Sequence, residues 1–422
     1  MTGAQILIEC LREQGVDVIF GYPGGAVLPI YDALYDVEDI RHIITAHEQN
    51  ATHAADGYAR ATGRPGVVLV TSGPGATNTV TGIATAYMDS VPIVVFTGQV
   101  ATSLIGRDSF QEVDIKGVTT PITKHNFMVK DVDELADTIR QAFTIAKSGR
   151  PGPVLVDIPK DVQVAEADYI PAKTDISYIK TDPFHPDTYA RQDIDGLLQK
   201  AIEIIEKSEK PIILAGGGIT VSGASDSLIG FAEHIDSPVV STLMGLGNFP
   251  AHHNLFLGMT GMHGSRYANY ALTHSDLIIA VGTRFSDRVV SDREKFGNGA
   301  KVIHIDIDAA EIDKNVTSHL SILGDVGQIL EKLVSRLPNK THTNGINDIQ
   351  KWKRAHPLKW DTTSKLNPQY IIETLSGLAE DRAIITTEVG QNQMWTAQFY
   401  KFTSPRTFIS SGGLGTMGYG LG

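Results

Sequence analysis

A glutamate placed between two glycine-rich turns is the best candidate for chemistry in this sequence. Glu48 follows an apolar run, Arg41 to Thr45, and precedes a helical pattern from about Asn50 to Ala61. The turns FGYPGGA (20–26) and TSGPGATN (71–78) also follow apolar runs. Because open parallel sheets place ligands at the carboxyl ends of their strands, we expect these loops to converge at one sheet edge. A carboxyl enclosed there would lose hydration, favour its protonated form and pass a proton near neutral pH.

Glycine-rich turns recur along the chain, which has 41 glycines among 422 residues. In TSGPGATN a strand ends just before a helical pattern, where free N–H groups attract an anion or a polar ligand. An ordinary tight turn explains that segment equally well. At AGGGIT (215–220) the Gly-x-Gly-x-x-Gly spacing is absent, and no acidic residue stands where a ribose would be held. This turn therefore gives only weak support to a Rossmann-type NAD site.

A second group of candidate residues lies in the middle of the chain. The turn GMHG (261–264) precedes a helical segment, whereas Arg284, Asp287 and Arg288 follow the apolar run DLIIAVG (276–282). A glycine-flanked helix start and arginines at a strand end suit a diphosphate ligand. The alternative for these arginines is a surface ion pair.

Two further sets of residues have ordinary explanations. The spacing of His42, His47, His53 and His125 suits no metal pair joined to a carboxylate, so they are interpreted as polar or core histidines. SFQE (109–112) combines an aromatic ring, an amide and a carboxylate in a loop. A packed phenylalanine with solvated neighbours is the plain interpretation of that loop.

The elements that must position these residues indicate the α/β class. Short apolar runs alternate with helical patterns, which is typical of parallel sheets covered on both faces. We expect three doubly wound β/α domains, at 1–170, 188–340 and 365–422, with polar, turn-rich connections near 170–187 and 338–344. The expected strands include 67–73, 92–98, 154–159, 211–218, 237–243, 276–282, 301–308 and 383–390, and a helix is expected at 194–206.

Composition excludes several classes of protein. The chain is 42% apolar and 20% charged, as in globular proteins, and its formal charge of −12 disfavours nucleic acid as a partner. Cys10 is the only cysteine, so no internal disulfide or thiolate zinc cluster can form. Its apolar runs are too short to span a membrane. The N-terminal segment lacks the profile of a signal or transit peptide, and a cytoplasmic location is expected.

With these residues in view, the sequence resembles the acetolactate synthase family of thiamine diphosphate enzymes from about Val16 to Leu421. The resemblance depends on blocks that occur in the family's order: FGYPGGAVLPIYDAL, HEQNATHAADGYARATGRPGV, TSGPGATN, VFTGQV, DSFQE, SGRPGPVLVDIPKDV, GMHG, RFSDRV, GQNQMW and SGGLGTMGYG. It implies three α/β domains that bind the cofactor's pyrimidine, FAD and the diphosphate. The implied reaction decarboxylates pyruvate and joins the product to a second 2-keto acid, pyruvate or 2-ketobutyrate.

The resemblance also implies residue roles. Glu48 matches the glutamate that hydrogen-bonds the aminopyrimidine ring, so that the cofactor becomes its own base. Met417 matches the residue that holds the cofactor bent, and Gln391 lies in the same cofactor region. Seven positions line the substrate site, and some of them also have catalytic or cofactor-binding roles. They are Gly25, Phe110, Gln111, Lys160, Met262, Asp287 and Arg288. The positions implied for FAD, whose role would be structural, are Arg150, Met262, His263, Gly264, Arg284, Asp306 and Asp325.

Several positions depart from the family pattern. Asn392 stands where histidine is usual, Ser286 where aspartate is usual, and Gly422 where proline is usual. The family's Gly-Asp-Gly motif, which is followed by an asparagine and holds Mg²⁺ at the diphosphate, does not occur in these 422 residues. The sequence therefore resembles a C-terminally truncated member, and we expect it to bind the cofactor poorly and to turn over little.

The family implies a homodimer or higher oligomer with a regulatory small subunit, and neither nucleic acid nor a membrane as a partner. Two alternatives remain open. The first is another thiamine-dependent decarboxylase or oxidase, such as pyruvate oxidase or the FAD-free catabolic acetolactate synthase. The second is a non-catalytic binding protein that kept the fold.

Overall fold

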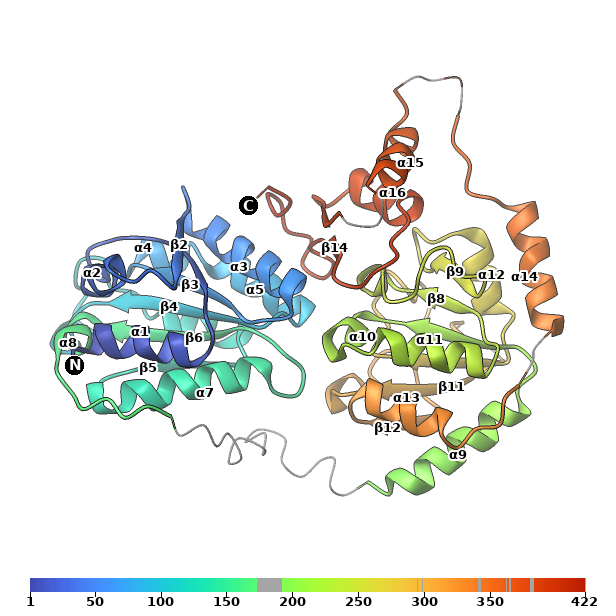
Figure 1. Ribbon diagram of the computed structural model, residues 1–422, viewed down its shortest axis with the longest axis horizontal. Helices are drawn as coiled ribbons and strands as arrows, with labels where there is room; N and C mark the ends of the chain where they lie inside the picture. The colour runs from blue at the N-terminus through green and yellow to red at the C-terminus, as the bar shows by residue number, and fades with distance from the viewer. Residues whose placement is uncertain are drawn as a thin grey trace. The chain divides into compact units, whose positions relative to one another are not determined.

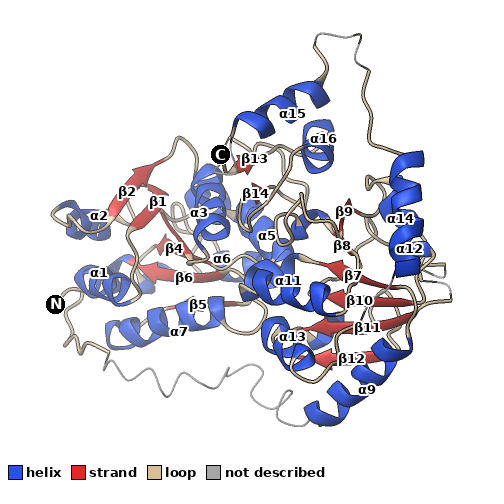
Figure 2. Ribbon diagram, turned by 45° about the vertical axis from the view of Figure 1, so that its right-hand side comes forward, coloured by secondary structure: helices blue, strands red, loops and turns tan. Residues whose placement is uncertain are grey.

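The computed structural model describes residues 1–172, 192–293, 295–297, 299–340, 343–361, 363, 366–379 and 383–421 (Figures 1 and 2). These residues form two compact units, Met1–His185 with Ser411–Gly422, and Pro186–Ser410. Most of the predicted connection at 170–187 lies outside the described residues. The three domain boundaries drawn from the sequence remain a prediction.

The first unit is built on a six-stranded parallel sheet in the order β2-β1-β3-β4-β6-β5. Its strands are β1 Val18–Tyr22, β2 Arg41–Ile44, β3 Gly66–Val70, β4 Ile93–Gln99, β5 His125–Met128 and β6 Val154–Pro159. Its helices are α1 Gly3–Glu13, α2 Leu28–Tyr35, α3 Glu48–Thr62, α4 Pro74–Thr77, α5 Val80–Asp89, α6 Ile115–Thr119, α7 Leu135–Lys147 and α8 Lys160–Val164. The central strands β3, β4 and β6 are buried throughout, which explains their continuous apolar sequences.

Helices cover both faces of this sheet. One face packs against α1, α2, α7 and α8, and the other packs against α3 and α5. Alternate residues of one strand serve the two cores: Val94 and Phe96 enter the first, whereas Val95 enters the second. The predicted doubly wound arrangement is therefore confirmed for this unit.

The second unit contains another six-stranded parallel sheet, in the order β12-β11-β10-β7-β8-β9. Its strands are β7 Pro211–Ala215, β8 Val239–Ser241, β9 Phe256–Met259, β10 Leu277–Val281, β11 Lys301–Asp306 and β12 Leu320–Leu323. Its helices up to Ala355 are α9 Ile194–Lys207, α10 Gly217–Ser222, α11 Ser225–His234, α12 Arg266–Thr273, α13 Val326–Val334 and α14 Thr343–Ala355. Helices α9, α10, α11 and α13 share one core with the sheet, and α12 and α14 share the other.

A small third sheet follows within the second unit. Its two parallel strands are β13 Ile385–Thr386 and β14 Phe408–Ile409, and its helices are α15 Pro368–Leu378 and α16 Gln391–Phe399. The strand expected over 383–390 is thus much shorter than predicted. Pro368 begins α15, as expected, with Asn367 as a side-chain cap of its first turn.

Candidate active site

Two glycine-rich turns meet at the carboxyl ends of neighbouring strands β1 and β3. Thr71 follows β3 directly, and its Oγ1 accepts a hydrogen bond of 3.3 Å from the Ala26 amide. A Cβ atom on Gly24 would lie 2.6 Å from the Thr71 side chain, so only glycine permits this approach. FGYPGGA and TSGPGATN therefore converge, as the sequence analysis expects.

Glu48 lies where these turns meet, as the first residue of α3 after β2. Its side chain is buried, with 9% of the residue exposed, and Oε2 accepts a 2.9 Å hydrogen bond from Asn78 Nδ2. A Cβ on Gly75 would lie 3.2 Å from Glu48 Oε1. Among the described residues, Asn78 is the only donor to this carboxylate, so Oε1 has hydrogen-bonding capacity for a ligand.

The loop that carries Phe110 and Gln111 packs against the same turn. Gln111 adopts a left-handed backbone with φ of 57°, and a Cβ on Gly73 would lie 2.7 Å from the Gln111 carbonyl oxygen. Such conformations are costly and are concentrated at functional sites. Phe110 is 87% exposed, so the interpretation of a packed phenylalanine is wrong.

Glu112 stabilises this loop by accepting hydrogen bonds from its backbone. Its carboxylate accepts hydrogen bonds from the Ser109 amide, at 2.9 Å, and from the Gly106 amide. These backbone donors lower the pKa of Glu112. The loop therefore presents Phe110 and Gln111 to solvent with a fixed backbone.

Gly25 and Lys160 lie at the same edge of the first sheet. Gly25 is exposed in the turn after β1, and a Cβ there would meet nothing within 4 Å. Lys160 is exposed at the start of α8, directly after β6. Neither residue forms a hydrogen bond with Glu48, so the structure brings them only to the same edge.

Met417 belongs to the C-terminal segment of the first unit and is 84% exposed. Its neighbour Thr416 shares a 2.6 Å hydrogen bond with Thr85, and Tyr419 donates to Asp56. Asp56 also lies 2.6 Å from the buried Arg60 guanidinium. This buried cluster was not predicted from the sequence, although Asp56 and Arg60 are four residues apart, a spacing that places them on one face of a helix.

A second buried carboxyl was also missed. Asp157 in β6 accepts hydrogen bonds from Thr97 Oγ1 at 2.7 Å and from Gln99 Nε2 at 3.0 Å. Burial raises the pKa of Asp157 to about 7. Gln99 also donates to the Val113 carbonyl at 2.9 Å, which links Asp157 to the loop after β4. The signal was an aspartate inside the apolar run VLVDIP.

In the second unit the structure brings together two segments predicted to bind a ligand. The Met262 amide donates to the Arg288 carbonyl at 2.8 Å, and Arg288 Nη1 contacts Met262 Sδ at 3.4 Å. A Cβ on Gly261 would lie 2.3 Å from the Arg288 carbonyl oxygen. The Arg288 and Asp287 side chains are 65% and 75% exposed, so both are open to solvent.

The remaining residues implied for FAD are partly engaged within the protein. Asp325 caps α13 by accepting from the Gln328 amide at 3.0 Å and from Ser222 Oγ at 2.7 Å. Asp306 is buried at the end of β11, and its Oδ1 accepts from the Asp308 amide at 2.9 Å. Each carboxylate oxygen of Asp325 accepts one of these hydrogen bonds and keeps a second lone pair, so Asp325 fits a donating ligand.

The other predicted positions have different hydrogen-bond partners or surroundings. The Arg284 carbonyl accepts from Asn315 at 3.0 Å, and the His263 carbonyl accepts from Gln398 at 2.6 Å. Gly264 follows His263, and a Cβ on it would lie 2.6 Å from the Met259 carbonyl oxygen. Gln391 is exposed at the start of α16. Arg150 lies in the first unit, where its Nε donates to Ser90 Oγ at 2.7 Å.

The AGGGIT glycines have a packing explanation. A Cβ on Gly216 would lie 2.0 Å from the Gly282 carbonyl oxygen, and one on Gly218 would lie 2.7 Å from the Gly282 Cα. These glycines let the ends of β7 and β10 approach each other closely, so the turn requires no nucleotide to explain it.

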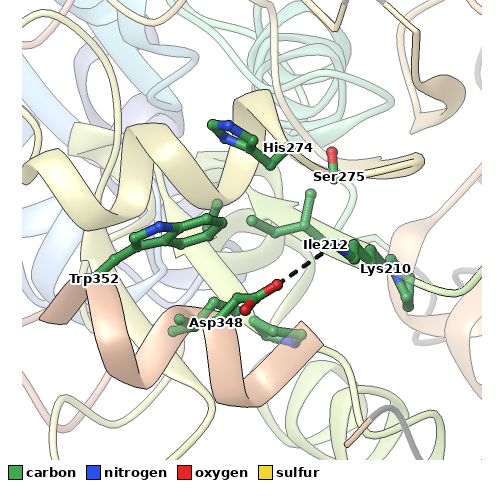
Figure 3. Close-up of a pocket in the computed structure, with 10 residues that line it drawn as sticks. Lys210, Ile212, His274, Ser275, Asp348 and Trp352 are labelled. Carbon is green, nitrogen blue, oxygen red and sulfur yellow. Dashed lines mark hydrogen bonds and ion pairs between the residues drawn. The ribbon is translucent and has the colours of Figure 1, made fainter. Parts of the chain in front are cut away.

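A small cavity in the second unit is lined by none of the candidate residues, and its lining is drawn in Figure 3. Its volume is about 20 Å³, which is room for one water molecule. It is lined by Ile212 of β7, His274 after α12 and Trp352 of α14, and Lys210 lies 3.5 Å from Asp348 beside it. We interpret it as a gap in the packing of α14 on the sheet.

The described part of the chain lacks a membrane-spanning helix and a metal-binding cluster. No helix there is long and apolar enough to cross a membrane. No group of three or more histidine, cysteine, aspartate or glutamate residues there is arranged to hold a metal ion.

Three regions of the chain match the domains of a known enzyme family. Residues 1–118 match the N-terminal TPP binding domain of thiamine pyrophosphate enzymes, and residues 198–333 match their central domain. Residues 388–422 match the C-terminal TPP binding domain. The chain thus contains three thiamine pyrophosphate enzyme domains, with a partial match to the third.

Individual relatives are similar over the whole of this chain. A probable acetolactate synthase large subunit of Methanocaldococcus jannaschii is 51% identical, with 100% of this chain and 72% of the relative covered. The acetolactate synthase large subunit of Buchnera aphidicola and the isozyme 3 large subunit of Escherichia coli are each 47% identical, with 100% of this chain and 74% of the relative covered. The chain belongs to the acetolactate synthase large subunit family of thiamine pyrophosphate enzymes.

Proposed function

We propose that this chain is the catalytic large subunit of an acetolactate synthase. The enzyme decarboxylates pyruvate and joins the two-carbon unit to a second 2-keto acid, which gives 2-acetolactate from pyruvate or 2-aceto-2-hydroxybutyrate from 2-ketobutyrate. The observation that supports this most is Glu48, a buried carboxyl with one oxygen paired to Asn78 and the other open, at the meeting point of the glycine turns.

The residues around Glu48 fit the aminopyrimidine of thiamine diphosphate. When bound, this cofactor would supply a nucleophilic ring carbon, and its positively charged thiazolium ring would accommodate the electron pair left by decarboxylation. Glu48 holds a proton at Oε1 and shares it with a ring nitrogen, while Asn78 fixes the carboxyl through Oε2. Gly75 leaves room beside Oε1, and the buried position excludes bulk water. In this proposal Met417 and Gln391 are further cofactor contacts.

The exposed residues at the strand ends line the substrate path in this proposal. In the first unit these are Gly25, Phe110, Gln111 and Lys160. Gln111 donates a hydrogen bond and Lys160 supplies a positive charge for a substrate carboxylate. In the second unit, Met262 and Asp287 contribute to the lining, and the Arg288 guanidinium binds the carboxylate of the second keto acid.

We assign FAD a structural role, because the reaction transfers no electrons to a flavin. The positions that would hold it are Arg150, Met262, His263, Gly264, Arg284, Asp306 and Asp325. For Mg²⁺ the described residues offer no ligand cluster, and the 422 residues contain no Gly-Asp-Gly motif.

The proposal includes a second copy of the chain and a regulatory small subunit as partners. Phe110, Met262 and Met417 support it, because each exposes half or more of a large apolar side chain, and such side chains are suited to a ligand or a partner. We assign the enzyme to the cytoplasm, since its only cysteine, Cys10, is buried and unpaired, as is usual in a reducing compartment.

A chimera tests this function. Residues 1–422 would be continued with the part of the Methanocaldococcus jannaschii relative that follows the alignment, then supplied with thiamine diphosphate, Mg²⁺, FAD and pyruvate. Acetolactate as the main product is expected. Peroxide or acetaldehyde as the main product would instead identify an oxidase or a simple decarboxylase.

A further inference from the structure

The second unit contains a larger cavity whose volume is about 330 Å³. Residues of β9, α12, α15 and α16 contribute to its lining, together with the end of α14 and the segment after it. A volume of this size is at the lower end of the range for small-molecule sites, about 300–1,000 Å³. None of the residues assigned above to thiamine diphosphate, FAD or keto acids lines it.

One part of the lining is apolar. Leu246, Met259, Phe399 and Phe402 are all less than 9% exposed, and they contribute to the wall together with Phe256. Met259 and Phe402 belong to one packed cluster with Leu246, so this part of the wall is fixed by its own packing. It suits the hydrocarbon body of a ligand.

The cavity also has a positively charged side. Lys353 Nζ donates to the Phe256 carbonyl at 2.9 Å and lies 5.9 Å from the centre of the Tyr267 ring. The ammonium therefore keeps two N–H donors. Burial, followed by the charge of Lys401, lowers the pKa of Lys353. Lys401 is a second ammonium in the lining.

Neither lysine has a carboxylate partner within 4.0 Å among the described residues. Glu373 is the single carboxylate in the lining, and its Oε2 accepts a 2.7 Å hydrogen bond from Trp360 Nε1. The lining thus contains two ammonium groups and one carboxylate. Lys353 is only partly buried, and because even a partly desolvated charge is stabilised by an opposite charge, an anion bound at Lys353 would supply the missing partner.

We propose that this cavity is a binding site for an organic carboxylate with an apolar body, whose carboxylate pairs with Lys353 and whose hydrocarbon part lies against Met259 and Phe402. The assignment is independent of the proposed function, because it uses none of the same residues. Its ligand class is a monocarboxylate larger than the keto acids of the reaction.

Octanoate tests the proposal with the 422-residue chain. Isothermal titration calorimetry would compare octanoate with octanamide, which has the same hydrocarbon body and no charge. Octanoate is expected to bind at least about tenfold more tightly, because a hydrogen bond to a charged group is worth more than a neutral one. Equal affinities, or no octanoate binding at millimolar concentration, would overturn the proposal.

Variants locate the site. Lys353→Met keeps the length of the side chain and is expected to reduce octanoate affinity about tenfold or more, whereas Lys353→Arg is expected to retain most of it. The matched control is Lys351→Met, because Lys351 is 69% exposed on the same helix and does not line the cavity. Lys401→Met is a second test, and folding should tolerate this substitution because Lys401 is exposed. It is expected to weaken the binding of octanoate and to leave the binding of octanamide unchanged. If Lys353→Met and Lys351→Met reduced octanoate affinity equally, the assignment of the binding site to this cavity would be contradicted.

Discussion

Glu48 is a carboxyl whose two oxygens have different surroundings. Oε2 is paired with Asn78, whereas Oε1 lies beside Gly75 and has no donor among the described residues. The sequence located this glutamate after a strand and between glycine turns, because strand ends and turn residues are local signals. It did not identify Asn78, since a partner thirty positions away is defined only by the path of the folded backbone.

Asp157 predicts a pH dependence of stability. Its pKa rises from 3.8 to about 7 on folding, so between these values the folded chain binds the proton more tightly than the unfolded chain does. The bound proton of Asp157 therefore stabilises the folded chain fully below pH 3.8, and this stabilisation is lost as the pH rises through about 7. Asp157→Asn removes this loss, which amounts to a few kcal/mol at most.

Urea unfolding of both proteins at pH 5 and pH 8 measures the effect. The stability of Asp157→Asn relative to the parent is expected to increase at the higher pH, because only the parent must give up a buried proton. Parallel changes in the two proteins would show that Asp157 does not titrate in this range.

At the scale of elements, the interior strands could be predicted and several edge strands could not. Strands β4, β6 and β10 are buried along their whole length and appear in the sequence as continuous apolar runs. Strands β5 and β12, at sheet edges, are short and only partly buried, so their apolar signal is weak. The strand near 385 was overestimated, because only two of its residues find a partner, in β14.

The turn between β3 and α5 predicts a steric requirement at Gly75. A Cβ there would lie 2.6 Å from Thr71 Cγ2 and 3.2 Å from Glu48 Oε1. Gly75→Ala is therefore expected to lower the free energy of unfolding by about 1–3 kcal/mol through overpacking. The measurement is the urea unfolding midpoint of the 422-residue chain.

Gly57 provides the control for that substitution. It lies inside α3, and a Cβ there would meet nothing within 4 Å. Gly57→Ala is expected to raise stability by about 0.5–1 kcal/mol, because alanine loses less backbone entropy in a helix. If Gly75→Ala were as stable as Gly57→Ala, the inference that a Cβ on Gly75 would collide with Thr71 and Glu48 would be wrong.

At the scale of the whole molecule, both large sheets are parallel, and the candidate residues follow strand ends in each. Glu48 and Gly25 follow strands of the first sheet, whereas Arg284 and Arg288 follow β10 of the second. The alternation of strands and helices predicted this arrangement, because parallel strands must be joined by crossovers. The grouping of Ser411–Gly422 with the first unit could not be predicted, since it depends on buried contacts such as that between Tyr419 and Asp56.

Cofactor binding by the 422-residue chain is predicted to be weak. The family's motif, which supplies oxygen ligands for Mg²⁺, is absent from these residues, and glycines have no side-chain oxygen that could replace them. The chain is expected to bind thiamine diphosphate with Mg²⁺ at least about a hundredfold more weakly than the chimera, as measured by calorimetry. Equal affinities would show that the metal is held by other residues.

In the proposed mechanism Glu48 passes a proton to the cofactor, and hydrogen exchange at the thiazolium carbon reports on this transfer. In the chimera, Glu48→Gln keeps an oxygen for Asn78 but cannot give up a proton. Deuterium exchange at this carbon is expected to slow by about 10²–10⁴-fold in Glu48→Gln. The exposed control Glu38→Gln is expected to exchange at the parent rate. Unchanged exchange in Glu48→Gln, with cofactor still bound, would contradict the account.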